Sequence, residues 1–233
     1  MIAIEHLHKH FGGCIAVNDI SFTARDGEIT GLLGANGAGK TTTLRIIAGL
    51  LTPQAGVVHI DGGLDALGAL LDHTGLYGRL TVRENIAYFG RLRGLPSLDG
   101  RVDAIIGRLD LGAIASRRVG GFSTGERLKV ALGRAMVHAP RHLLLDEPTN
   151  GLDIPSVRSL RSLLRRMRDR GHCILFSSHV LEEVQALCDR IVVIAHGEVA
   201  AEGTPGELLR ETGCASLEDA YLRLAGRPEV SVC

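Results

Sequence analysis

The chain has 233 residues, a formal net charge of zero and a hydrophobic share of 45%, which suits one large domain or a domain with an extra lobe and allows a sizeable core. The balanced charge and the 3% aromatic content, with Trp absent, argue against a nucleic-acid partner, because such proteins use basic surfaces and stacking aromatics. No apolar run approaches the roughly 18 residues of a membrane span and the N-terminus lacks the layout of a signal peptide, so we expect a cytoplasmic protein.

The N-terminal part of the chain is predicted to form an antiparallel β lobe that leads into a Gly-rich loop. Strand-forming runs between turn residues predict strands at 2–8, 14–24 and 28–33. Phe11 stands directly before a Gly-Gly turn. An exposed aromatic ring there could stack on a nucleotide base, or the ring could belong to the core, and position alone leaves both open.

The segment Gly34–Thr41, GANGAGKT, follows the apolar strand and opens a predicted helix over 42–50. Its glycines let consecutive backbone N–H groups surround a phosphate, and the helix N-terminus adds partial positive charge. Lys40 can place an ammonium group against the outer phosphates, and the Thr41 hydroxyl can bind Mg²⁺. A strand, a Gly-rich loop and a helix joined by Gly-Lys-Thr therefore predict the phosphate-binding loop of a nucleotide triphosphatase.

The middle of the chain is predicted to be helical. After short strands at 57–60 and 67–71, helical spacing of apolar residues predicts helices at 81–95, 99–112 and 123–138. Because no strand separates these helices, they suggest a helical lobe inserted into an α/β core. Ser123 and Glu126 form a capping-box pattern, which taken alone is only a helix start.

Two carboxylates end the apolar strand predicted at 142–147. Asp146 suits a Mg²⁺ ligand, and Glu147 suits orienting or deprotonating an attacking water. Taken alone, the pair would more often be an acidic strand end at a turn. A phosphate-binding loop in the same chain favours the active-site interpretation.

The last third is predicted to complete the sheet. A helix begins near Pro155, a buried strand at 173–176 is followed by Ser-Ser-His, and 190–202 forms a hairpin. A His at the carboxyl end of a parallel strand faces the ligand crevice, so His179 could contact a terminal phosphate, although an isolated His is more often structural. The tail from Pro205 is predicted to form short helices.

In combination and in this order, the motifs over about residues 2–203 resemble the ATP-binding cassette (ABC) ATPase subunits. The segments that carry the resemblance are the Walker A loop (Gly34–Thr41), the signature motif (Phe122–Glu126), Walker B with the catalytic Glu (Leu143–Glu147), the D-loop (Asn150–Asp153) and the switch histidine (His179). Phe11 matches the adenine-stacking aromatic of the family, which favours the stacking interpretation.

The resemblance implies an α/β fold with a P-loop NTPase core, an N-terminal antiparallel β lobe and an inserted α-helical lobe. One ABC-type domain would span 1–233, with core and β lobe at 1–72 and 139–203, the helical lobe at 73–138 and a C-terminal tail at 204–233.

The resemblance also implies the site residues. ATP is expected to contact Phe11, Val17, Asn36, Gly37, Ala38, Gly39, Lys40, Thr41, Thr42, Ser123, Gly125 and Asp153. The expected catalytic residues are Glu147, His179 and Lys40, and the expected Mg²⁺ ligands are Thr41, Asp72 and Asp146. Two positions depart from the family pattern, because Asp72 replaces the Q-loop Gln and Glu126 stands where Gln is common.

The family mechanism implies partners that one chain does not contain. Two cassettes pair head to tail as a homodimer, each ATP lies between the phosphate loop of one and the signature helix of the other, and the cycle drives a separate transmembrane permease at the inner face of the membrane. A docking groove is expected around 75–94. The segment 72–85 most resembles sodium-extruding exporter ATPases, whose relatives export drugs or polysaccharides. The alternatives are a soluble ABC ATPase of a non-transport machine and an interaction module that hydrolyses little.

Overall fold

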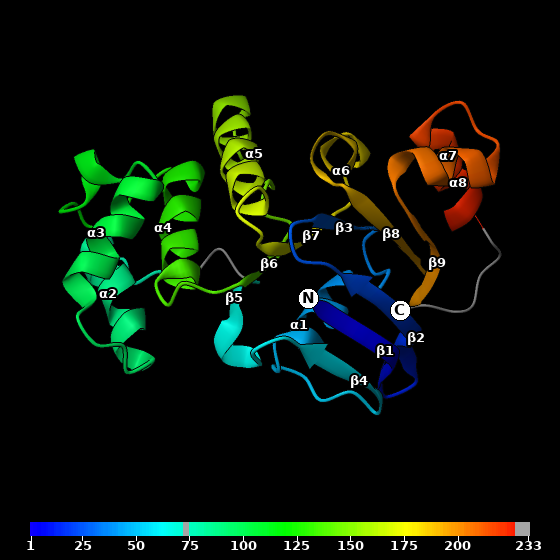
Figure 1. Cartoon of the computed structure of the whole chain (residues 1–233), viewed down its shortest axis with the longest axis horizontal. Helices are drawn as coiled ribbons and strands as arrows, with labels where there is room; N and C mark the ends of the chain where they lie inside the picture. Colours follow the sequence, from blue (N-terminus) through cyan, green and yellow to red (C-terminus); the bar gives the residue numbers. More distant parts are fainter. Residues whose placement is uncertain (72–74, 227–233) are drawn as a thin grey trace.

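The computed structural model describes residues 1–71 and 75–226, and a six-stranded sheet lies at its centre (Figure 1). In spatial order, its strands are β5 (Leu67–Leu70), β6 (His142–Asp146), β7 (Cys173–Ser178), β3 (Ile29–Leu33), β8 (Arg190–Ala195) and β9 (Glu198–Gly203). The strands from β5 to β8 run parallel, and β9 pairs antiparallel with β8. The carboxyl ends of β3, β6 and β7 therefore meet at one edge of the sheet.

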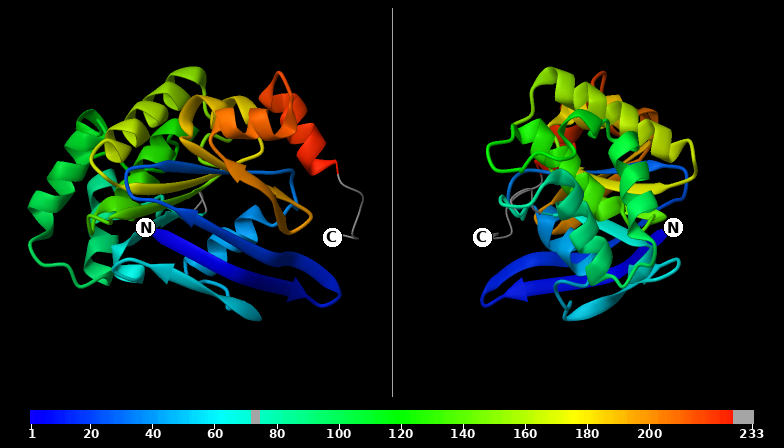
Figure 2. Two further views of the ribbon diagram at one scale, coloured as in Figure 1. Left: turned by 45° about the vertical axis from the view of Figure 1, so that its right-hand side comes forward. Right: turned by 90° about the vertical axis from the view of Figure 1, so that its left-hand side faces the viewer.

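A three-stranded antiparallel sheet lies against one face of the central sheet (Figure 2). Its strands in spatial order are β2 (Cys14–Ala24), β1 (Ile2–Phe11) and β4 (Ala55–Ile60). The first strand runs to Phe11, beyond the predicted end at residue 8. Register shifts between Ile4 and His10 interrupt its alternation of inward and outward side chains, and this interruption hides the continuation from a pattern of period two.

The central sheet is buried on both faces, as a parallel sheet requires. Side chains alternate between two hydrophobic clusters: on β7, Ile174 and Phe176 face one cluster, whereas Cys173 and Leu175 face the other. Because both faces are covered, the strands appear in the sequence as continuous apolar runs such as 143–145.

Helices cover the two faces unequally. Helix α1 (Lys40–Ile47) lies on the same side as the antiparallel sheet. The opposite face carries α5 (Ile154–Arg168), α6 (Leu181–Leu187), α7 (Pro205–Thr212) and α8 (Leu217–Ala225), as Figure 1 shows. The last two are the short helices predicted for the tail.

A group of three helices lies beyond the β5 edge of the central sheet (Figure 1). Its members are α2 (Val82–Leu92), α3 (Leu98–Arg108) and α4 (Thr124–Met136). Two short 3₁₀ helices are also formed, η1 (Leu64–Ala66) before β5 and η2 (Gly112–Ile114) between α3 and α4. The helix predicted to run to residue 112 ends at Arg108, because Asp110 adopts a left-handed backbone with φ of 52°.

The predicted fold class is confirmed: an α/β core, an antiparallel β sheet before it, and a helical insertion between β5 and β6. The numerical domain boundaries stay predictions. Within residues 1–71 and 75–226, no helix combines the length and the hydrophobicity that crossing a bilayer requires.

Candidate active site

The phosphate-binding loop joins β3 to α1. Gly37 and Gly39 have φ of 82° and 105°, a region that side chains with a Cβ avoid. A Cβ built on Gly39 would also lie 2.4 Å from the Ala16 carbonyl oxygen. Gly39 is the N-cap of α1 and offers no side-chain cap, so the first N–H groups of this helix are left for another acceptor, such as an anion.

The Lys40 side chain is folded into this loop and is only 4% exposed. Its Nζ donates to the carbonyl oxygens of Gly34 at 2.7 Å and Ala35 at 3.0 Å, and it lies 3.6 Å from Glu147 Oε1. Burial lowers the pKa of Lys40 from its ordinary value, and the nearby carboxylate of Glu147 opposes this shift. The loop thus holds a desolvated cation beside a carboxylate.

Glu147 follows the last residue of β6 and has φ of 46°, a strained conformation for a residue with a Cβ. Its N–H donates to Ser177 Oγ at 3.0 Å, which holds this backbone in place. Its Oε2 lies 2.7 Å from Nδ1 of His179, which follows β7 directly. Glu147 therefore contacts both the loop lysine and the strand-end histidine.

Asp146, the last residue of β6, is 8% exposed and lies beside Ser177 in the register of the sheet. Ser177 Oγ donates to Asp146 Oδ1 at 2.5 Å. Thr41 is half-buried in the first turn of α1. A carboxylate and a hydroxyl are oxygen donors of the kind that Mg²⁺ prefers, so these residues fit the ion. The predicted ligand Asp72 lies outside the described residues.

The remaining predicted contacts of the loop are placed as follows. Asn36 and Gly37 are exposed, Ala38 is buried and Thr42 is half-buried. Phe11 is 49% exposed at the end of β1, with Lys9 Nζ 5.2 Å from its ring centroid. An exposed ring is available for stacking.

Val17 does not fit its predicted role. It is 0% exposed and belongs to the cluster that packs the antiparallel sheet against the central sheet. A side chain without accessible surface offers a ligand nothing to contact, so we assign Val17 to the core.

The signature and D-loop residues form a second group, at the N-termini of α4 and α5. Ser123 caps α4, and Asp153 caps α5 by accepting from the Ser156 N–H at 2.8 Å. The two caps adjoin, because a Cβ built on Gly125 would lie 2.4 Å from Ser156 Oγ. These N–H-rich helix starts can hold an anion, but Glu126 already accepts from the Ser123 N–H at 2.9 Å, which lowers the pKa of Glu126.

The roles of Ser177 and of the Thr149 and Ser178 hydroxyls were not predicted from the sequence. Ser177 joins Asp146 to Glu147, while Glu183 accepts hydrogen bonds from Thr149 and from Ser178 Oγ, the latter at 3.1 Å. The available signal was a pair of serines ending an apolar strand, directly before His179.

Comparisons with known proteins identify the family of this chain. The family model described as "ABC transporter" matches residues 17–150. The ABC transporter ATP-binding protein NatA of Bacillus subtilis is 46% identical over 200 residues, which covers 81% of each chain. Nod factor export ATP-binding protein I of Burkholderia lata is 38% identical and covers 93% of this chain and 75% of that relative.

Solved structures give the same result. A structure described as the ATP-binding subunit of an ABC transporter superposes with a TM-score of 0.87 at 28% identity, covering 96% of this chain and 99% of the other. A nucleotide-free ATP-binding cassette superposes with a TM-score of 0.81 at 23% identity, which supports the fold alone. ABC ATP-binding domains bind ATP, and the family implies ATP hydrolysis. The chain belongs to the ABC transporter family, as an ATP-binding subunit.

Proposed function

We propose that this chain hydrolyses ATP as the motor subunit of an ABC exporter and powers a separate membrane permease. The observation that most directly supports hydrolysis is the 3.6 Å approach of Lys40 Nζ to Glu147 Oε1. Lys40 is a cation suited to a terminal phosphate, and Glu147 is a base suited to the attacking water. They lie at ion-pair distance at the carboxyl edge of the central sheet, where the phosphate-binding loop leads into α1.

Each residue of the site has a chemical task in this proposal. Backbone N–H groups of 36–39 and of the first turn of α1 bind the phosphates, and the exposed ring of Phe11 stacks on the adenine. Lys40 exchanges its loop carbonyl partners for phosphate oxygens. Glu147 accepts the proton of the attacking water, and His179 orients that carboxylate through their 2.7 Å contact.

Magnesium would be held by Thr41 and Asp146, together with Asp72. When bound, the ion would supply positive charge that offsets the charge of the phosphates. Ser177, which donates to Asp146, fixes the orientation of that carboxylate.

Two substitutions test the site. Glu147→Gln should bind ATP with unchanged affinity and lose turnover by about 10²-fold or more, because the amide cannot accept a proton. Lys40→Ala should lose tight ATP binding. Nucleotide fluorescence titration and phosphate release measure the two properties, with Glu218→Gln on the exposed face of α8 as the matched control. Full turnover by Glu147→Gln would remove the base assignment.

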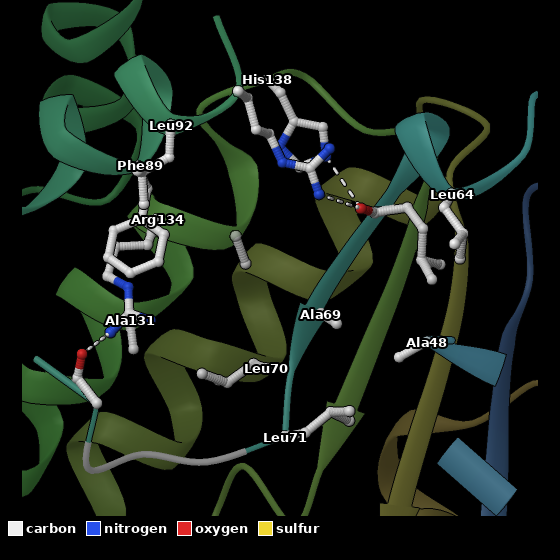
Figure 3. Close-up of a pocket in the computed structure, with 14 residues that line it drawn as sticks. Ala48, Leu64, Ala69, Leu70, Leu71, Phe89, Leu92, Ala131, Arg134 and His138 are labelled. Atoms are coloured by element: carbon white, nitrogen blue, oxygen red, sulfur yellow. Dashed lines mark hydrogen bonds between the residues drawn. The ribbon is translucent and has the colours of Figure 1, made fainter. Parts of the chain in front are cut away.

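A groove beside the three-helix group is the proposed docking site for the permease (Figure 3). Its volume is about 670 Å³, and its walls include Leu70, Leu71 and Phe89. Arg134 stacks 3.8 Å from the centroid of the Phe89 ring and donates to the Gly75 carbonyl. An apolar wall with guanidinium groups suits an amphipathic segment that carries an acidic side chain.

An exposed leucine of this groove tests the docking. Leu92 lines the groove and is 64% exposed. Leu92→Glu should abolish capture of a multi-span membrane protein from detergent-solubilised membranes and should leave basal turnover unchanged. Leu222→Glu is the matched control, because Leu222 is 61% exposed on α8. Equal capture by both variants would exclude this groove as the docking site.

Export, dimerisation and location complete the proposal. The name of the relative Nod factor export ATP-binding protein I supports the export direction. We place the chain at the inner face of the membrane as a homodimer, in which the signature helix α4 of one copy closes over the ATP held by the other. The helix starts at Ser123 and Asp153 support this arrangement, since the positive ends of both helix dipoles favour an anion, although the Glu126 and Asp153 carboxylates already accept from N–H groups there.

A further inference from the structure

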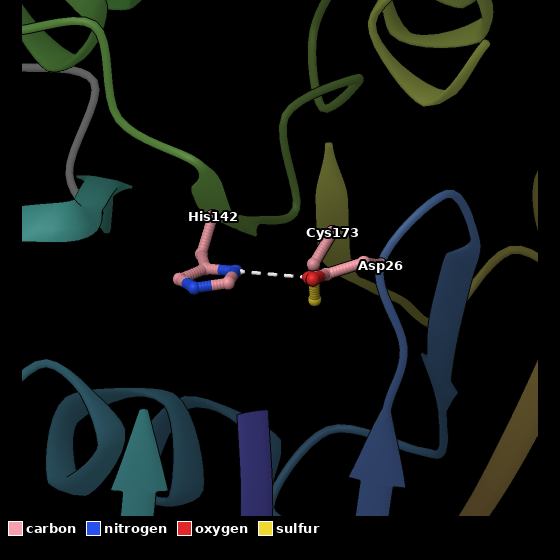
Figure 4. A group of neighbouring side chains, drawn as sticks. All are labelled: Asp26, His142 and Cys173. Atoms are coloured by element: carbon pink, nitrogen blue, oxygen red, sulfur yellow. Dashed lines mark ion pairs between the residues drawn. The ribbon is translucent and has the colours of Figure 1, made fainter. Parts of the chain in front are cut away.

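Three side chains of metal-binding type converge at the amino ends of the parallel strands, at the edge opposite Asp146 and Glu147 (Figure 4). Asp26 lies in the turn before β3, His142 begins β6 and Cys173 begins β7. One potential ligand atom from each lies within 4.8 Å of those of the other two.

The sheet register brings two of these side chains together. His142 and Cys173 are direct partners in the parallel pairing of β6 with β7, and partners in neighbouring parallel strands project to the same face. Both are 0% exposed. The turn that contains Asp26 passes this face, and Asp26 Oδ1 lies 3.6 Å from His142 Nδ1.

A hydrogen bond on the other side of the His142 ring indicates which ring nitrogen carries the proton. His142 Nε2 lies 2.8 Å from the Asp61 carbonyl oxygen, which only accepts, so Nε2 carries the proton. Nδ1 then presents a lone pair toward Asp26. Among the described residues, Nδ1 is buried without a hydrogen-bond partner. A buried lone pair facing a carboxylate is unfavourable unless the ring gains a second proton or a cation lies close to both groups, as the Met1 ammonium 2.8 Å from Asp26 Oδ1 or a bound metal ion would.

We propose that Asp26, His142 and Cys173 bind a divalent transition-metal ion, and that Zn²⁺ is the ion that suits them. Imidazole, thiolate and carboxylate together are donors that zinc accepts, whereas Mg²⁺ and Ca²⁺ prefer oxygen alone. The carbonyl that fixes the imidazole is the kind of outer partner that metal-binding histidines use. Binding converts the Cys173 thiol, which now donates to the Ala24 carbonyl at 3.5 Å, into a thiolate and releases its proton to the solvent.

The three ligands contribute unequally. Asp26 is 37% exposed, and its carboxylate also contacts the Met1 amino group at 2.8 Å and Arg141 at 3.5 Å. The ion must compete with these cations for Asp26, and the Met1 ammonium also acts electrostatically on His142 and Cys173. Because the cluster ties β6, β7 and the turn before β3 together, the bound ion stabilises the sheet away from the nucleotide edge.

Cobalt titration of the purified, nucleotide-free chain tests the proposal. Bound Co²⁺ should produce a thiolate charge-transfer absorption, and this absorption should disappear when Zn²⁺ displaces Co²⁺. His142→Gln and Cys173→Ser should each weaken binding by more than about 100-fold, and Asp26→Asn by about tenfold, since loss of outer partners alone costs 10–100-fold. Cys188→Ser is the matched control, because Cys188 is also a buried free thiol and should keep the absorption. ATP binding by each variant reports that it is folded.

Two results would overturn the proposal. One is a thiolate absorption that survives Cys173→Ser, which would locate the ion at another cysteine. The other comes from X-ray absorption of the zinc-loaded unsubstituted chain, which does not depend on any variant folding. We expect one sulfur at about 2.3 Å with lighter N or O ligands, and a shell without sulfur would exclude the site.

Discussion

Ser177 connects the two carboxylates of the active site although it contacts neither ATP nor water in the proposed reaction. Its buried Oγ donates to Asp146 and accepts from the Glu147 N–H, so one hydroxyl orients a predicted metal ligand and the predicted base. Glu147 needs this support because its φ of 46° costs about 1–3 kcal/mol of strain. We therefore treat Ser177 as a positioning residue.

Ser177→Ala should lower the unfolding free energy by about 1–3 kcal/mol, because the buried Asp146 carboxylate loses the hydroxyl that donates to it and the Glu147 N–H keeps only the Ser177 carbonyl oxygen at 3.2 Å. If the hydroxyl positions Glu147, kcat should fall while KM for ATP changes little, a split that simple destabilisation does not produce. Steady-state kinetics and urea unfolding measure both effects. Ser159→Ala, on the exposed side of α5, is the control. An unchanged kcat would reduce Ser177 to a packing residue.

Gly39 is required by the backbone of the loop rather than by chemistry. Gly39→Ala would combine φ of 105° with a Cβ 2.4 Å from the Ala16 carbonyl oxygen, so it should cost more than about 2 kcal/mol of stability and abolish ATP binding. Gly13→Ala is the control, because nothing lies within 4 Å of its Cβ and its φ is not positive. Calorimetric melting with and without ATP distinguishes the two variants.

The difference between local motifs and contacts made by strand pairing explains which site residues could be predicted from the sequence. Lys40, Glu147 and His179 come together because they lie in the segments that follow β3, β6 and β7, and the carboxyl ends of parallel strands meet at one edge. Val17 and Ser177 were missed or misassigned because burial and cross-strand hydrogen bonds depend on which strands become neighbours. A local motif does not contain that information.

At the scale of elements, local signals predicted helix starts better than strand ends. The capping box of Ser123 with Glu126 placed the start of α4, and this box is formed. Helix α2 begins within one residue of its predicted start, where Thr81 and Glu84 form a second capping box. The end of β1 was wrong because register shifts are a property of strand pairing. Helix α3 was predicted too long because the left-handed residue that ends it, Asp110, is not a glycine, so the sequence carries no local signal for the turn.

His138 links the end of α4 to β5, since its Nε2 lies 3.0 Å from the Leu67 carbonyl oxygen. Burial lowers the pKa of His138 below the ordinary value of 6.5, Arg93 lowers it further, and the Leu67 carbonyl and Asp65 oppose the shift. The unfolded chain therefore binds this proton more tightly than the folded chain. The contribution of the neutral ring to stability is complete above about pH 6.5 and is lost as the pH falls below it.

His138→Gln should remove this part of the pH dependence. Urea unfolding at about pH 7.5 and about pH 5.5 should show a larger loss of stability in the unsubstituted chain than in the variant. His10→Gln, at an exposed position of β1, should behave like the unsubstituted chain. Equal losses in all three proteins would mean that His138 is not protonated preferentially in the unfolded state.

At the scale of the whole molecule, the site residues fall into two groups on different elements. The loop, Asp146, Glu147 and His179 lie at the carboxyl edge of the central sheet, whereas Ser123 and Asp153 begin α4 and α5. In the proposed homodimer each group would complete the other across the interface. Every ATP would then be bound by residues of two chains, and mixing two variants can test this sharing.

Mixing two inactive variants tests whether the site is shared. Lys40→Ala disables the loop of one chain, and Ser123→Arg blocks the signature helix of the other. In a mixed head-to-tail dimer both defects fall in one site, and the second site combines an intact loop with an intact signature. Random pairing makes half of the dimers mixed, so the mixture should recover about a quarter of normal turnover while each variant alone stays inactive. Full turnover by Ser123→Arg alone would mean that α4 does not close the site, and a mixture without activity would argue against head-to-tail pairing.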